Sequence, residues 1–321
     1  MQIQVAVSER SFIHPGVRYH ARMQRRRRGR TDIDISPLAL GCWPIAGMTS
    51  LGVTPQSSVA TLEAAVEQGI NFLDTAYCYG EDGDSERMIA KTLGHRRDEL
   101  VIATKGGIHW DADLSRVLDA RPATIARECD ESLRRLNTDR VELLYLHAPD
   151  LDTPIEESAG AFKQLLDVGK ARSIGVSNTS LAQMKAFASV CPIAAYQPAY
   201  NMIMRDIERD GRLDWCVEQG VSVCAYWPLM KGLFAGRLKR DHVFDPKDGR
   251  KKYPMFQGDE WQRNQDLIDA LRPIAEDAGV TLTQLTLAWT IAQPGITAAL
   301  VGAKRPEQII ENVGAMRVEL T

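Results

Sequence analysis

Four polar side chains of types used in proton transfer fall at related places in the sequence. Asp74, Lys105 and His147 each come directly after a short apolar run, and Tyr79 follows Asp74 by five residues. A phenol has an ordinary pKa of about 10, and it donates its proton more readily when a buried cation stabilises the phenolate. Lys105 would supply that charge, and Asp74 would keep the lysine protonated. His147 would orient a substrate oxygen or share in proton transfer.

Each of these residues also has an ordinary structural interpretation when it is taken alone. Asp74 would cap a helix, Lys105 would be a surface amine, Tyr79 would pack half-buried, and His147 would be a hydrogen-bonded core imidazole. Their joint placement, after three apolar runs and in one adjoining loop, favours a shared site over four separate roles.

Short apolar runs alternate with longer segments of helical period from Ile35 onward. This alternation is typical of βα units around a parallel sheet. The predicted strands are Pro37–Leu40, Ile70–Leu73, Leu100–Thr104, Val141–Leu146, Ala171–Val176, Ile193–Gln197, Val221–Tyr226 and Ala298–Val301. The predicted crossover helices are Ser57–Gln68, Ser85–Leu93, Pro122–Leu136, Ile155–Val168, Leu181–Ala188 and Arg212–Glu218. We therefore predict an α/β fold, a (β/α)8 TIM barrel whose active site lies at the C-terminal ends of its strands.

The regular spacing is interrupted twice. Gly232–Gln257 is rich in Lys, Arg, Asp and Pro, and helical patterns at Trp261–Ala278 and Leu282–Ala292 follow it, which predicts a long loop and an extra helix before the last strand. Residues 1–30 form an N-terminal arm, expected to be solvated and flexible, ahead of a barrel at 31–321. An anion-binding or subunit-contacting arm is the alternative. The arm carries Arg22, Arg25, Arg26, Arg27, Arg28 and Arg30.

The composition argues against several classes of protein. A net charge of -3, with 25% charged and 44% hydrophobic residues, gives no sign of a nucleic-acid or acidic-membrane partner. No apolar run approaches the roughly 18 residues that cross a bilayer, and no signal peptide is recognised. The six cysteines are scattered without CxxC pairs, so we expect reduced thiols, no metal site and a cytoplasmic location.

The sequence contains the short motifs Gly69–Ala76 with Tyr79-Gly80 and Ser85-Glu86, Ala103–Lys105, Leu144–His147, and Ile174–Asn178. The order and spacing of these motifs resemble the aldo-keto reductase superfamily. The chain is most similar to the longer-chain, bacterial-type branch that also contains the potassium-channel β-subunits, and the resemblance runs from about Arg30 to Met316. It implies that Asp74, Tyr79, Lys105 and His147 form a catalytic tetrad for NADPH-dependent reduction of an aldehyde or ketone.

The sequence holds no GxGxxG motif, which argues against a Rossmann domain. The family resemblance implies instead that NADPH binds across the mouth of the barrel. The nicotinamide would contact Ser177, Asn178 and Gln197, with Tyr226 stacked on its ring. The pyrophosphate would lie along Trp227, Pro228, Leu229, Met230 and Arg237. The adenosine would be surrounded by Gly302, Lys304, Arg305, Gln308, Glu311 and Asn312, at a predicted helix start that favours phosphate. Arg250 is a weaker candidate for folding over the cofactor.

Two positions depart from the pattern of many relatives. Trp227 stands where many relatives have a serine, so a side-chain hydrogen bond to the pyrophosphate is not expected there. Ala148 stands where many have a tryptophan, which predicts a wider substrate pocket. Trp43 and Trp110 are candidates to line that pocket. The expected partner is a small-molecule carbonyl compound, and a homo-oligomer is compatible with the sequence. Two alternative functions remain: a cofactor-binding regulatory subunit with little turnover, and a sugar-phosphate isomerase or aldolase that uses no nicotinamide.

Overall fold

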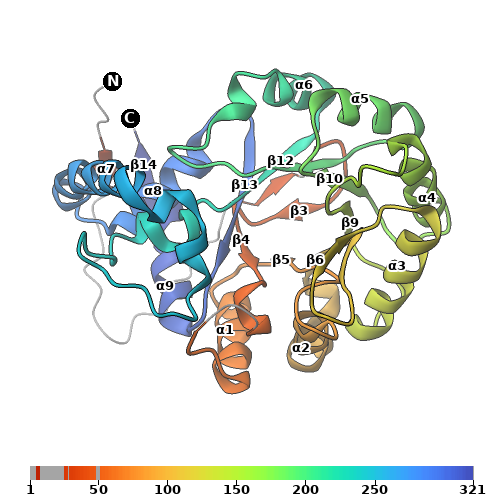
Figure 1. Cartoon of the computed structure of the whole chain (residues 1–321), viewed down its shortest axis with the longest axis horizontal. Helices are drawn as coiled ribbons and strands as arrows, with labels where there is room; N and C mark the ends of the chain where they lie inside the picture. Colours follow the sequence, from red (N-terminus) through yellow and green to blue (C-terminus); the bar gives the residue numbers. More distant parts are fainter. Residues whose placement is uncertain (1–4, 8–24, 28, 48–50, 321) are drawn as a thin grey trace.

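Parallel strands close into a barrel in the computed structural model, which describes residues 5–7, 25–27, 29–47 and 51–320 (Figure 1). Around the barrel the strand order is β10-β11-β12-β13-β4-β5-β6-β9, and each strand pairs in parallel with its neighbours. The eight predicted strands are confirmed, with ends shifted by a few residues. Their bounds are β4 Leu38–Gly41, β5 Phe72–Asp74, β6 Val101–Gly106, β9 Leu143–Leu146, β10 Ile174–Ser177, β11 Ala195–Gln197, β12 Ser222–Tyr226 and β13 Ile296–Gly302.

Helices surround the barrel as predicted. Capping boxes fix the starts of three of them, where Thr54, Ser180 and Thr281 each accept a hydrogen bond from the backbone N–H three residues later. The extra helix before the last strand is confirmed as α7. The bounds are α1 Pro55–Glu67, α2 Asp84–Leu93, α3 Pro122–Leu136, α4 Ile155–Asp167, α5 Leu181–Val190, α6 Arg212–Gln219, α7 Gly258–Asp277, α8 Leu282–Ala292 and α9 Pro306–Gly314. Short 3-10 helices are η1 Pro44–Ala46, η2 Gly94–Glu99, η3 Asp206–Glu208, η4 Met230–Ala235, η5 Gly249–Lys252, η6 Pro254–Phe256 and η7 Ala315–Arg317.

The barrel interior is filled by side chains of unequal size. Phe72 and Tyr145 are fully buried there beside small residues such as Ala39 and Ala195. A Cβ atom at Gly175 on β10 would overlap the Tyr145 ring, so the glycine makes room for the tyrosine. Because the strands are buried on both faces, they read as continuous apolar runs in the sequence.

A short hairpin lies near the N-terminal end of the barrel. Its strands are β2 (Arg26–Arg27) and β3 (Asp34–Ile35). The Arg26 guanidinium donates to the backbone oxygens of Ile291, Ile296 and Thr297 at 2.9, 3.3 and 3.2 Å, so this residue of the predicted arm is anchored. The strand β1 (Val5–Val7) pairs with β14 (Val318–Leu320). Arg22, Arg28 and most of the arm lie outside the described residues, so the expected flexibility stays a prediction.

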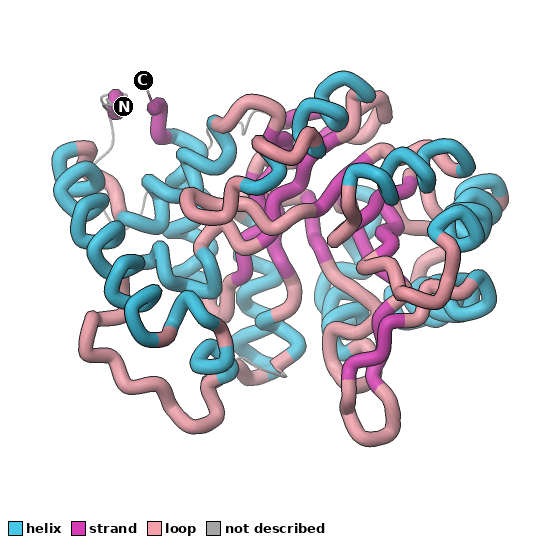
Figure 2. Tube along the Cα trace, turned by 45° about the horizontal axis from the view of Figure 1, so that its top comes forward, coloured by secondary structure: helices cyan, strands magenta, loops and turns pink. Residues whose placement is uncertain are grey.

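Two segments project from the same end of the barrel (Figure 2). One is a hairpin of β7 (Ile108–Trp110) and β8 (Arg116–Leu118), which joins β6 to α3. The other is the loop that runs from η4 through η5 and η6 to α7. The second was predicted, whereas the first has strands too short and too polar to produce an alternating pattern. Among the described residues, no helix combines the length and apolar character that a membrane crossing requires.

Candidate active site

Lys105 is the centre of a buried polar cluster at the C-terminal end of the barrel. Its ammonium group donates to Asp74 Oδ1 at 2.6 Å, to the Thr75 backbone oxygen at 2.7 Å and to the Tyr79 hydroxyl at 3.2 Å. All three hydrogens of the ammonium therefore have an acceptor. Lys105 and Asp74 side chains are 0% and 4% exposed, so this ion pair is shielded from solvent.

This environment decides the protonation of the lysine and the tyrosine. Burial alone would lower the pKa of Lys105, but the adjacent Asp74 carboxylate and Tyr79 oxygen more than offset it, so the pKa is raised and the amine stays charged. Burial raises the pKa of Tyr79 above its ordinary value, although the Lys105 charge opposes that rise. The resting tyrosine therefore keeps its proton. The ammonium is placed to stabilise a phenolate once the proton has been given away.

His147 completes the predicted set of four. Its ring lies edge-on to the Tyr79 ring, with centroids 5.9 Å apart. Burial, and next the charge of Lys105, lowers the pKa of His147 well below its usual value, so the imidazole is neutral. The Cys78 sulfur lies 3.6 Å from Nδ1 of this ring. A neutral imidazole with one occupied nitrogen can still use the other toward a substrate oxygen.

Local hydrogen bonds hold the loop that carries Tyr79. The Tyr79 backbone N–H donates to the Ala76 oxygen, and the Tyr79 oxygen accepts from the Ser85 N–H at the start of α2. The Thr75 hydroxyl donates to Ser85 Oγ at 2.8 Å. Gly80 has a φ of 102°, and a Cβ atom there would overlap Asp84. The sequence Tyr79-Gly80 thus permits the turn that returns the chain to α2.

The four residues expected at the nicotinamide form one hydrogen-bonded chain beside this cluster. The Gln197 amide donates to Asp74 Oδ2 at 2.7 Å, so its nitrogen serves the ion pair. The Ser177 hydroxyl donates to the Gln197 backbone oxygen at 2.8 Å. Asn178, at a φ of 56°, donates to the His147 backbone oxygen and accepts from the Tyr226 hydroxyl at 2.9 Å. These contacts connect the strand ends β9, β10, β11 and β12.

The segment after β12 has an unusual backbone, with φ of 58° at Trp227 and 44° at Met230. The buried Asn201 side chain holds this turn by donating to the Trp227 oxygen at 3.1 Å. Met230 is 2% exposed and packs with Leu233 in a separate apolar cluster, so its side chain faces away from solvent. Pro228 is likewise buried, and Leu229 is partly buried against the same cluster. Because the side chains of Pro228, Leu229 and Met230 are buried or partly buried, it is their backbone that is best placed to contact a ligand.

Cations gather where α9 begins. Lys304 is half-buried, Arg305 is exposed at the helix N-cap, and burial followed by the nearby Arg250 charge lowers the pKa of Lys304. An anion at this place would relieve that repulsion. Arg250 is held by Asp248, with guanidinium nitrogens 2.7 to 3.1 Å from the carboxylate.

The first turns of α9 carry the other predicted adenosine residues. Gln308 Oε1 accepts from the Lys304 backbone N–H at 2.8 Å, and Glu311 pairs with Arg237 at 2.5 Å. The Asn312 side chain is 2% exposed, and its amide nitrogen has no hydrogen-bond partner in the described part of the chain. A buried donor without a partner is costly, so it marks a place where a ligand acceptor fits. Gly302, at the end of β13, has no room for a Cβ against Pro44.

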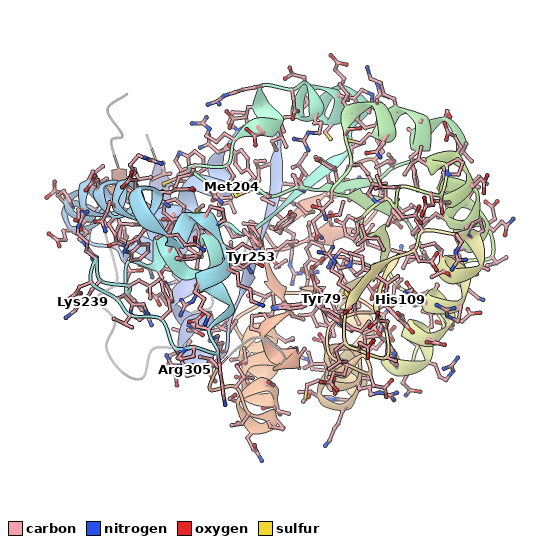
Figure 3. All side chains as sticks on the ribbon, viewed as in Figure 1. Tyr79, His109, Met204, Lys239, Tyr253 and Arg305 are labelled. Atoms are coloured by element: carbon pink, nitrogen blue, oxygen red, sulfur yellow. The ribbon has the colours of Figure 1, made fainter. Side chains whose placement is uncertain are left out.

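Both tryptophans proposed for the substrate pocket lie next to Tyr79. Trp43 meets the Tyr79 ring edge-on at 5.0 Å between centroids. Trp110 donates its indole N–H to the Cys78 backbone oxygen at 2.8 Å and packs in a small apolar cluster with Ala148. Figure 3 shows Tyr79 near the centre of the barrel and Arg305 at the periphery, so the polar cluster and the α9 cations are well separated.

Three further contributors were given no role in the site from the sequence. The Thr75 backbone oxygen binds Lys105, the Cys78 thiol contacts His147, and the charge of Arg116, on the β7–β8 hairpin, acts on His147 and Tyr226. The first two sit inside the Asp74–Tyr79 loop, so its sequence pointed to them. Arg116 gave no signal, because the hairpin itself was not predicted.

Comparison with known proteins places the chain among reductases. The model of the aldo/keto reductase family matches residues 37–321. Aldo-keto reductase YhdN of Bacillus subtilis is 36% identical over 87% of this chain and 84% of its own length. Aldo-keto reductase yakc of Schizosaccharomyces pombe, whose name specifies NADP(+), is 32% identical over 89% and 85%. The glycerol dehydrogenase AKR11B4 from Gluconobacter oxydans superposes with a TM-score of 0.83 at 35% identity, over 91% of this chain and 90% of that one.

Proposed function

This chain belongs to the aldo/keto reductase family and is an NADP-dependent oxidoreductase, and we propose that Asp74, Tyr79, Lys105 and His147 carry out its reduction of an aldehyde or ketone. One observation carries the assignment of roles. The Lys105 ammonium contacts both the Asp74 carboxylate and the Tyr79 hydroxyl in a buried setting at the barrel mouth. This is the arrangement that a phenolic general acid needs.

The residues divide the work of protonating a carbonyl oxygen. NADPH, when bound, supplies the hydride that reduces the carbonyl carbon. Tyr79 gives its hydroxyl proton to the oxygen as negative charge develops there, and the Lys105 ammonium stabilises the phenolate that remains. Asp74 holds the lysine charged and in place. The neutral His147 orients the carbonyl oxygen toward the Tyr79 hydroxyl.

The residues on the cofactor path fit the chemistry of NADPH. We propose that Ser177, Asn178, Gln197 and Tyr226 hold the nicotinamide end, since amide and hydroxyl groups converge there beside Tyr79. At the other end, the α9 cations would bind the 2′-phosphate, and the unpartnered Asn312 amide would donate to the adenine. Between them, Arg237 and the backbone of Trp227 to Met230 would follow the pyrophosphate.

The two alternative functions are less well supported. A regulatory subunit with little turnover is not favoured, because the similar proteins are named as reductases and a dehydrogenase. An isomerase or aldolase without a nicotinamide finds no support in the family match. Both alternatives predict little or no oxidation of NADPH by added carbonyl compounds.

The decisive experiment follows NADPH absorbance while the purified chain is mixed with a panel of aldehydes and ketones. We expect steady oxidation of NADPH with at least one compound, and retention of the activity when metal ions are chelated. The absence of turnover with every compound, together with tight NADPH binding, would favour the regulatory alternative. We also propose a cytoplasmic location, supported by six cysteines that are all buried and free, and cell fractionation tests it.

A further inference from the structure

The β7–β8 hairpin brings a cation to the active-site mouth that the reduction itself does not use. Arg116 lies directly opposite Trp110 in the antiparallel register of the hairpin. Directly opposed residues project from the same face, with Cβ atoms about 5 Å apart. The Trp110 side chain is bound to the Cys78 backbone oxygen, next to Tyr79. Arg116 therefore projects from the face of the hairpin that covers the Tyr79 loop.

The charge of Arg116 affects the pKa values of residues on both sides of the mouth. Burial raises the pKa of the Tyr226 phenol on β12, and Arg116 is the largest influence opposing that rise. After burial and Lys105, Arg116 is also the next influence lowering the pKa of His147 on the β9 side. These two residues end strands on opposite sides of β10. The electrostatic influence of Arg116 on both residues agrees with its place opposite Trp110 on the hairpin.

Nothing in the described part of the chain neutralises this guanidinium, which has no ion-pair or hydrogen-bond partner there. Asp111 on the same hairpin is engaged in the turn, where it accepts from the backbone N–H groups of Asp113 and Ser115. Inside the mouth, Asp74 is already balanced by Lys105, and His147 is neutral. Arg116 is thus a cation beside the opening whose guanidinium is left available for a ligand.

We propose that Arg116 is an anion-binding residue of the substrate pocket, and that the enzyme prefers carbonyl compounds bearing a carboxylate at the end remote from the carbonyl. The inference rests on the proposed reduction at Tyr79 and adds the substrate class. A planar guanidinium matches a carboxylate with two parallel hydrogen bonds. The neighbouring Trp110 supplies an apolar wall for the carbon chain between the two polar ends.

The test compares anionic aldehydes with their neutral methyl esters. Two pairs of different length are used: succinate semialdehyde and 4-formylbenzoate, each against its ester, at saturating NADPH. For the unsubstituted chain, we expect kcat/KM to favour at least one anion. In Arg116→Gln, the ratio of anion to ester should fall about tenfold, through KM rather than kcat, because the carboxylate contact is the same in the ground and transition states. The preference should also weaken as salt rises.

Two further variants separate a specific contact from general charge. Arg116→Lys keeps the charge but loses the planar guanidinium, so it should retain only part of the preference, whereas Arg134→Gln removes an exposed cation from the outer helix α3 and should leave the ratio unchanged. An unchanged ratio in Arg116→Gln, or an equal loss for acids and esters, would overturn the inference while the reductase assignment stands. If the unsubstituted chain reduces neither acids nor esters nor any other aldehyde, the proposed function fails, and this inference fails with it.

Discussion

Cofactor choice gives the sharpest quantitative test of the α9 cluster. The double substitution Lys304→Ala, Arg305→Ala should weaken NADPH binding by about ten- to hundredfold and leave NADH nearly unchanged. The two cofactors differ by a 2′-phosphate, which carries close to two negative charges near neutral pH. The backbone N–H groups at the start of α9 contribute to both proteins equally, so the difference isolates the two side chains.

The magnitude follows from the burial of each side chain. A charge-assisted hydrogen bond contributes about 1.5 to 3 kcal/mol in favourable settings, and an exposed ion pair contributes about 0 to 1 kcal/mol. Lys304 is half-buried and falls near the lower end of the first range, whereas Arg305 is exposed and belongs to the second. Their sum is about 1.5 to 2.5 kcal/mol, which lies within the stated ten- to hundredfold. The exposed part should shrink as salt rises.

The same cluster predicts the behaviour of the protein without cofactor. Burial, and then the Arg250 charge, lowers the pKa of Lys304. A lysine with a lowered pKa in the folded state is destabilising while it is protonated; the penalty is complete below the folded pKa and disappears as pH rises from there to the higher pKa of the unfolded chain. At neutral pH, the double variant without cofactor should therefore have an unchanged or slightly higher Tm.

Titration calorimetry with NADPH and NADH, on the unsubstituted chain and the double variant, measures both affinities. The matched control is Arg134→Ala, Lys185→Ala, which removes the same two charges from exposed positions on α3 and α5. An equal loss of affinity for NADH and NADPH would refute the assignment of these residues to the 2′-phosphate, as would an equal effect of the control.

Three further predictions address the acid, its titration and the N-terminal arm. Tyr79→Phe should keep NADPH affinity in calorimetry but lower kcat at least about 100-fold, because the ring stays and only the acid is lost. Near-normal turnover of this variant would show that the acid is another group. Because burial raises the pKa of Tyr79, kcat for reduction should stay level through neutral pH and fall only above about pH 10, and a decline near pH 7 in the kcat profile would contradict it. Deleting residues 1–24 should barely change Tm or NADPH affinity, whereas a deletion through Arg27 should lower Tm by about 2 to 5 °C, because the three carbonyl contacts of Arg26 are lost. A large drop in Tm, or a loss of oligomer, with the shorter deletion would refute that expectation.

The barrel was predictable because its elements are encoded locally. Each strand is a run of apolar residues buried on both faces, and each helix has an apolar stripe, so both periods can be read without tertiary information. The hairpin of β7 and β8 was not predicted, because its strands are only three residues long and include polar residues such as His109 and Arg116, so no apolar alternation marks them. The hydrogen bonds of Arg26 to three backbone oxygens could not be predicted from the sequence, because these partners are more than 260 residues away along the chain.

The sequence by itself determined which groups meet at the mouth of the barrel. The C-terminal ends of parallel strands converge at one end, so Asp74, Lys105 and His147 were bound to lie together once the strands were recognised. Only the tertiary structure decided what each group does there. Burial keeps His147 neutral and raises the pKa of Tyr79 despite the nearby ammonium, whereas the adjacent Asp74 carboxylate and Tyr79 oxygen keep Lys105 charged against the effect of its burial. Protonation depends on the distances and solvent exclusion that arise when distant segments pack, and no local pattern of residues records them.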